Sequence, residues 1–147
     1  EQWSKKLGGA PLAFIHKTRD ITRPNQSHAN RVVGEVEGRL CILVDDMIDT
    51  GRTLALASKT LEAAGAKRIF AISTHGLLSG RAVDLIARTQ IEKLVVTNTI
   101  SNTEKAAQSN GKIEVIDMSA VMGETIRRAH HGESISTMFR QDAEIMF

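Results

Sequence analysis

Residues 44–53 read VDDMIDTGRT, and this stretch decides the fold. It follows a run of β-forming residues at 40–44, and a helical pattern begins near Thr53. The adjacent carboxylates of Asp45 and Asp46 are therefore predicted where a buried strand ends. Carboxylates accept hydrogen bonds from the hydroxyl groups of a sugar, and the free N–H groups at the start of a helix bind a phosphate. The pattern indicates a site for a phosphorylated sugar, with ribose 5-phosphate as the natural candidate.

A plainer interpretation of the same residues exists. An Asp-Asp pair after a strand is often solvated loop, and Thr50 or Thr53 can act as no more than a helix cap. The complete string favours the site, because it adds a third carboxylate, Asp49, and a glycine, Gly51, that lets the backbone close around an anion. The string resembles the phosphoribosyl-pyrophosphate (PRPP) binding loop of the type I phosphoribosyltransferase fold. Alone it does not choose among the enzymes that share this loop.

Composition narrows the class of protein. The 147 residues are 41% hydrophobic and 24% charged, with a net charge of +2 and one cysteine, Cys41. This length suits a single domain, 1–147, with a real core. Aromatic residues make up 3%, and basic residues are mixed with acidic ones, so nucleic-acid binding is not expected. A lone cysteine, no signal peptide and no long apolar run predict a cytoplasmic protein without membrane contact.

Strands and helices are expected to alternate along the chain. Helical periodicity with an apolar stripe covers 53–64, and a stop is predicted at Gly65. A further helix is expected over 119–130, with Ser119 as its cap and Gly132 as its stop. The strongly apolar strands favour an α/β fold, a three-layer sandwich whose mostly parallel sheet is covered on both faces. Ligands bind beyond the carboxyl ends of such strands. The remaining expected elements are strands at 12–16, 31–36, 40–44, 68–74, 93–97 and 112–116 and a helix at 81–88.

A second group of polar residues lies at the start of a long polar loop. Lys17 and Arg19 are two residues apart, so in an extended chain their side chains point the same way. They are either solvent-exposed cations at the start of the loop, without a function, or the cations of a mobile loop that closes over a phosphoryl group and neutralises its charge during transfer.

Several blocks together resemble the C-terminal half of ribose-phosphate diphosphokinase (PRPP synthetase), in the family's order and over nearly the whole chain. They are FIHKTR (14–19), VVGEVEG (32–38), ILVDDMIDTG (42–51), AGAKRI (64–69), STHGLLSG (73–80), VVTNTI (95–100) and GESIS (132–136). The resemblance implies a phosphoribosyltransferase-like fold. It also implies transfer of diphosphate from ATP to ribose 5-phosphate with Mg²⁺, giving PRPP and AMP for nucleotide biosynthesis. Family members form homo-oligomers, with a hexamer as the expected state.

The resemblance also assigns roles to residues. Lys17 and Arg19 match the catalytic cations of the flexible loop. Ser134 and Ser136 match a Ser-x-Ser segment that binds a phosphate of the allosteric nucleotide at a subunit interface. No residue is assigned as a protein metal ligand. The ribose 5-phosphate site corresponds to Asp45, Asp46, Asp49, Thr50, Gly51, Arg52 and Thr53.

Two departures from the family pattern define the alternatives. Arg52 stands where the family usually has a small residue, mostly glycine. The N-terminal half of the family, with its ATP-binding residues, catalytic histidine and Pro-Asp-Ala-Gly-Gly-like loop, has no counterpart in this sequence, so the isolated chain is predicted to be inactive. The alternatives are a non-catalytic regulatory paralogue, which should have lost the acids or cations, and a PRPP-using phosphoribosyltransferase, which should show a base-stacking aromatic residue.

Overall fold

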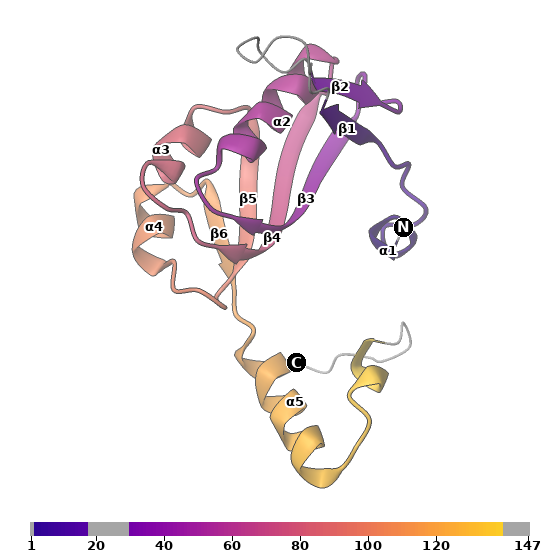
Figure 1. The fold of residues 1–147 in the computed structure, drawn as a ribbon, viewed down its shortest axis with the longest axis vertical. Coiled ribbons are helices and arrows are strands. Elements are labelled where there is room, and N and C mark those ends of the chain that lie inside the picture. Colours follow the sequence, from indigo (N-terminus) through magenta and orange to yellow (C-terminus); the bar gives the residue numbers. More distant parts are fainter. Residues whose placement is uncertain (1, 18–29, 140–147) are drawn as a thin grey trace.

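The computed structural model describes residues 2–17 and 30–139, and Figure 1 shows an α/β fold built on two sheets. Four parallel strands form the larger sheet in the order β3 (Leu40–Ile48), β4 (Arg68–Gly76), β5 (Ile91–Thr97) and β6 (Ile113–Ile116). The helices α2 (Arg52–Ala63), α3 (Ala82–Ala87) and α4 (Thr103–Gln108) connect them. The smaller sheet pairs β1 (Phe14–Lys17) antiparallel with β2 (Asn30–Val33). The predicted fold class is confirmed.

The main core lies between the parallel sheet and the helices α2 and α3. Leu94 and Val96 of β5 are fully buried, and they meet the apolar stripe of α2, in which Leu54 and Leu61 are each 4% exposed. The helix α2 ends as predicted, with Gly65 at a φ of +83°. The apolar stripe thus packs α2 along the strands. As a result, the helix begins at the carboxyl edge of the sheet.

The opposite face of the sheet is covered in part. The helix α1 (Gln2–Lys6) lies on this side (Figure 1), where Trp3 lines a recess with Val44 and Ile72. Yet Val44 keeps 47% of its surface exposed, and Ile42 keeps 36%. Apolar strands predict a sheet buried on both faces, and within the described residues this holds fully for one face.

Some boundaries differ from the sequence prediction. The strand β3 continues through Asp45 and Asp46 to Ile48, because Asp45, Met47 and Ile48 still pair with β4. The short helix α4 was not predicted.

The helix α5 (Ser119–His131) begins next to Asp117, whose carboxylate accepts hydrogen bonds from the backbone N–H and the hydroxyl of Ser119 at 2.8 and 2.6 Å. The prediction that Ser119 is the cap is therefore wrong: the N-cap is Met118, and the Ser119 hydroxyl donates to Asp117 instead of accepting an N–H of the helix.

The C-terminal elements lie apart from the sheet. Figure 1 shows α5 and the 3₁₀ helix η1 (Ser136–Phe139) on a separate arm beyond β6. Gly132 ends α5 in the left-handed conformation, as predicted. Met122 and Ile126 of α5 are 50% and 70% exposed. In the described ranges, no helix has the length and apolar character that crossing a membrane requires.

Candidate functional site

Backbone hydrogen bonds join the two loops that follow β3 and β4. The N–H groups of Leu77 and Leu78 donate to the carbonyl of Ile48 at 2.9 and 3.1 Å, and the N–H of Ser79 donates to the carbonyl of Asp49 at 3.0 Å. Leu78 is buried and has a φ of +51°, an unusual conformation for a branched side chain. The loops at 45–53 and 75–80 therefore form one connected edge.

The helix α2 begins at this edge with an open amino end. Its N-cap, Gly51, has a φ of 73°, and among the described residues no side chain caps the helix. The first N–H groups of a helix have no acceptor within the helix, so those that follow Gly51 can donate to an anion. A Cβ at position 51 would lie 3.5 Å from Ile86 and 3.7 Å from Ala82, which shows that α3 packs directly behind the turn. The turn therefore leaves backbone donors of α2 without a side-chain acceptor among the described residues.

The acid pair lies at the carboxyl end of β3. Asp45 and Asp46 are exposed, and each carboxylate accepts the next backbone N–H, from Asp46 at 3.0 Å and from Met47 at 2.8 Å. Both residues line a recess of about 380 Å³ with Thr74 of β4. Each local hydrogen bond uses one carboxylate oxygen and leaves the others for the hydroxyl groups of a ligand.

A polar network continues the edge across β4 and β5. The ring nitrogen Nδ1 of His75 lies 2.8 Å from the hydroxyl of Thr99, which lies 2.9 Å from the hydroxyl of Thr97. The Thr97 hydroxyl donates to the carbonyl of Thr74 at 2.7 Å. Sequence reasoning assigns no role to these two threonines, although Thr97 ends a predicted strand and Thr99 follows it at the same edge.

The cations Lys17 and Arg19 remain untested. Lys17 ends β1 and pairs with Asn30 of β2, and Arg19 lies outside the described residues. The hairpin that carries Lys17 packs near the carboxyl-terminal half of α2, where Arg31 and Lys59 line a common recess. This is the end of α2 remote from Gly51, and the clamp role of Lys17 and Arg19 stays a prediction.

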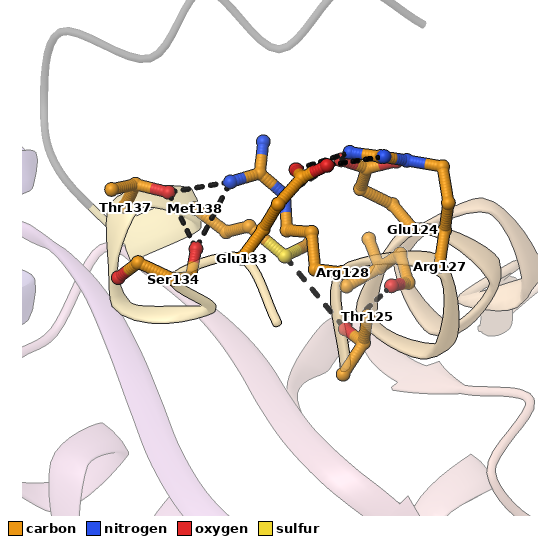
Figure 2. Close-up of polar contacts among 9 residues, drawn as sticks. Glu124, Thr125, Arg127, Arg128, Glu133, Ser134, Thr137 and Met138 are labelled. Carbon is orange, nitrogen blue, oxygen red and sulfur yellow. Dashed lines mark hydrogen bonds and ion pairs between the residues drawn. The ribbon is translucent and has the colours of Figure 1, made fainter. Parts of the chain in front are cut away.

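The hydroxyl groups of Ser134 and Ser136 lie 2.9 Å apart in the segment that follows α5. Figure 2 shows how α5 holds this segment: Arg128 donates to the carbonyl of Ser134 at 3.0 Å and to the hydroxyl of Thr137 at 2.6 Å. Arg128 is itself paired with Glu124 at 2.6 Å. The two predicted phosphate-binding hydroxyls are thus adjacent, on an arm apart from the sheet.

A second arginine completes this ion-pair cluster. Arg127 contacts Glu133 with two nitrogens, at 2.8 and 2.7 Å, and also pairs with Glu124. Hydrogen bonds from Arg127 and then Arg128 lower the pKa of Glu124 from 4.5 to about 2. The hydrogen bond from Arg127 likewise lowers the pKa of Glu133. Both carboxylates are therefore ionised at neutral pH: Glu133 ties the segment to α5 through Arg127, and Glu124 pairs with both arginines within α5.

The fold is a parallel α/β domain whose carboxyl edge carries an uncapped helix start and an exposed acid pair. The sequence matches the Phosphoribosyl synthetase-associated domain over residues 15–140, and the chain belongs to this family.

Relatives with known names agree with this assignment. The chain is 45% identical over 139 residues to ribose-phosphate pyrophosphokinase of Bifidobacterium longum, covering 95% of this chain and 40% of the relative. It is 50% identical over 128 residues to ribose-phosphate pyrophosphokinase 2 of Schizosaccharomyces pombe, covering 87% and 39%. The crystal structure of phosphoribosylpyrophosphate synthetase from Mycobacterium smegmatis superposes with a TM-score of 0.77 at 40% identity, covering 89% and 40%. The chain thus spans about two fifths of the length of these relatives.

Proposed function

We propose that this chain is the sugar-phosphate-binding half of a ribose-phosphate diphosphokinase. Its relatives are named for that activity, and the carboxyl edge of the sheet offers one anion site and one acid pair side by side. Together with an N-terminal half that supplies the ATP site, it would transfer diphosphate from ATP to the C1 hydroxyl of ribose 5-phosphate. The products are PRPP and AMP, and the isolated chain has no synthetase activity.

Each part of ribose 5-phosphate has a matching group in the site. The 5-phosphate accepts hydrogen bonds from the N–H groups of the first turn of α2 and from the hydroxyls of Thr50 and Thr53. The ribose hydroxyls donate to Asp45 and Asp46. Diphosphoryl transfer demands little covalent chemistry of a protein, so holding the C1 hydroxyl in line with ATP is the main contribution of this half.

The acid pair also fits Mg²⁺ that arrives with the substrates. Within residues 2–17 and 30–139, no group of three His, Cys, Asp or Glu side chains is placed to hold a metal. Mg²⁺ is commonly bound by one or two carboxylates together with phosphate oxygens and water, and Asp45 and Asp46 can supply the carboxylates. The ion would neutralise charge on the phosphates of ATP.

Further parts of the proposal concern catalysis, regulation and assembly. Lys17 and Arg19 stabilise the charge that develops on the transferred group. The adjacent hydroxyls of Ser134 and Ser136 bind a phosphate of a regulatory nucleotide, and their place on a projecting arm suits an interface in a homo-oligomer, expected to be a hexamer. The lone cysteine, Cys41, fits action in the cytoplasm.

The observation that carries this proposal is the uncapped start of α2 beside Asp45 and Asp46. Calorimetric titration of the chain with ribose 5-phosphate and Mg²⁺ tests it. We expect saturable binding at one site per chain. Asp46→Asn should weaken it about fivefold, because a charged acceptor is replaced by a neutral one. Glu62→Gln, at the far end of α2, is the matched control and should bind normally.

Failure of the titration has a defined meaning. If circular dichroism shows a folded chain that binds no ribose 5-phosphate, the catalytic assignment is refuted and a regulatory paralogue with a disabled loop replaces it. Equal affinity of the Asp46→Asn variant and the unmodified chain would instead show that the acid pair does not hold the ribose.

A further inference from the structure

A recess lined by arginines adjoins the phosphate loop on the side of α3. It has a volume of about 550 Å³ and lies between the start of α2 and the helix α3. Its charged residues are Arg52, Arg81, Asp84 and Arg88, which we call the basic pocket. Sequence reasoning finds only Arg52 among them, because Arg81 and Arg88 form no pattern in the sequence and meet Arg52 only through the packing of α3 on α2.

The basic pocket has an excess of positive charge. Three guanidinium groups face one carboxylate, so the local balance is three minus one, or +2. The one ion pair is weak, since Arg81 Nε lies 3.5 Å from Asp84 Oδ2 and both side chains are mostly exposed. Arg52 and Arg88 form no ion pair with any residue that the structure describes.

Three other arginines of the fold are instead paired with carboxylates. Arg39, Arg68 and Arg128 each have a carboxylate oxygen at 2.6 Å. Arginine is suited to planar recognition of carboxylate or phosphate, and its charge on a surface is usually compensated where an acid is in reach. The cluster in the basic pocket is therefore available to an external anion.

The cations are carried by elements that are fixed to one another. Gly51, which precedes Arg52, packs against Ile86 and Ala82 of α3, and both of these side chains are at most 1% exposed. Three backbone hydrogen bonds link 48–49 to 77–79, directly before Arg81. Little backbone rearrangement is needed to bring the guanidinium groups to one ligand, which limits the entropy lost on binding.

We propose that the basic pocket is a second anion site, which binds inorganic phosphate or the phosphate group of a small phosphate ester beside the sugar-phosphate loop. The lining contains no aromatic side chain among the described residues, so it offers nothing for a base to stack on. Ser79 also lines the pocket, and its hydroxyl can donate to the same anion. The inference rests on the proposed function only in taking the neighbouring loop as the ribose 5-phosphate site.

The test follows the side-chain Nε–Hε NMR signals of the pocket arginines in the 147-residue chain. The sample is first saturated with ribose 5-phosphate, and inorganic phosphate is then added at constant ionic strength. We expect saturable shifts at Arg81 and Arg88. The dissociation constant should rise about three- to fivefold in Arg88→Ala, the range of an exposed ion pair, and fall about twofold in Asp84→Asn. Lys67→Ala, an exposed cation outside the pocket, is the control.

Several outcomes would overturn the proposal. Chloride at the same ionic strength could produce the same shifts, or Arg88→Ala could bind phosphate as well as the unmodified chain. If ribose 5-phosphate alone shifts the signals of Arg81 and Arg88 and added phosphate shifts them no further, the pocket is part of the ribose 5-phosphate site. If ribose 5-phosphate does not bind but phosphate still moves Arg81 and Arg88, the proposed function fails and the second site stands. Repeating the titration with methyl phosphate shows whether the pocket accepts esters or only the free ion.

Discussion

Replacing Gly76 with alanine tests how the end of β4 is locked to the loop after β5. A Cβ at position 76 would lie 3.0 Å from Cγ1 of Val96 and 3.1 Å from Nδ2 of Asn102. Val96 is fully buried and Asn102 is 2% exposed, so neither neighbour can move into solvent. The φ of Gly76 is not in the left-handed region, so the effect comes from packing and not from backbone strain.

The size of the effect follows from two contributions. Overpacking a well-filled core costs about 1–3 kcal/mol. Asn102 donates to the carbonyl of Gly76 at 2.8 Å, and displacing its amide would leave a buried carbonyl without this donor, which costs about 1–3 kcal/mol. Moving the Asn102 amide away relieves the crowding but weakens its hydrogen bond, so the two costs add only in part. We therefore expect Gly76→Ala to lower the free energy of unfolding by about 2–4 kcal/mol.

Urea denaturation followed by far-UV circular dichroism measures this change. The matched control is Gly123→Ala in α5, where no atom lies within 4 Å of the added Cβ and where alanine favours the helix by about 0.5–1 kcal/mol. A double-mutant cycle with Asn102→Ala should show a coupling of about 1–2 kcal/mol, since both changes disturb one hydrogen bond. A loss below about 0.5 kcal/mol for Gly76→Ala would refute the close packing from which the argument starts.

Three further predictions concern the site and the arm. Thr53→Val should raise the dissociation constant of ribose 5-phosphate about two- to tenfold by calorimetry, because one hydroxyl hydrogen bond is lost; an unchanged value contradicts its role. Lys17→Ala in the complete two-half enzyme should lower kcat about 10²–10³-fold with ribose 5-phosphate binding retained, and a pure rise in KM would count against a transition-state role. Because the folded-state pKa of Glu124 is depressed from 4.5 to about 2, its contribution to the arm is complete above pH 4.5 and is lost as the pH falls towards 2. NMR shifts at Thr137 should follow this transition, and Arg127→Ala should move it to higher pH.

Much of the fold could be predicted because its patterns are local. The stripe at 53–64 and Gly65 predict α2 and its end, and both are confirmed. The boundary of β3 could not be predicted, since the acid pair reads as a loop and the strand continues past it only because Asp45, Met47 and Ile48 pair with β4. Likewise, Asp117 and not Ser119 provides the acceptor at the start of α5. Which of the two side chains accepts depends on the geometry of the preceding turn, and the sequence does not reveal that geometry.

The candidate site divides in the same way. The loop at 49–53 is contiguous, so its residues could be recognised together in the sequence. The network of His75 with Thr97 and Thr99, and the basic pocket, join residues that are 20 or more positions apart. Such groups meet only when parallel strands bring successive loops to one edge, and no periodicity in the chain records which side chains will be neighbours there.

The carboxyl edge is held by hydrogen bonds between successive loops and not by any single element. Carbonyls of Ile48, Thr74 and Gly76 accept donors from the loop of the next strand along the sheet. The edge is therefore ordered before a ligand binds, and the N–H groups after Gly51 need no rearrangement to meet a phosphate. It follows that a change such as Gly76→Ala should weaken ribose 5-phosphate binding only as far as it loosens these links. Variants at Thr53 or Asp46 should weaken binding with no loss of stability. A measured separation of the two effects would show that fold and site at this edge depend on different residues.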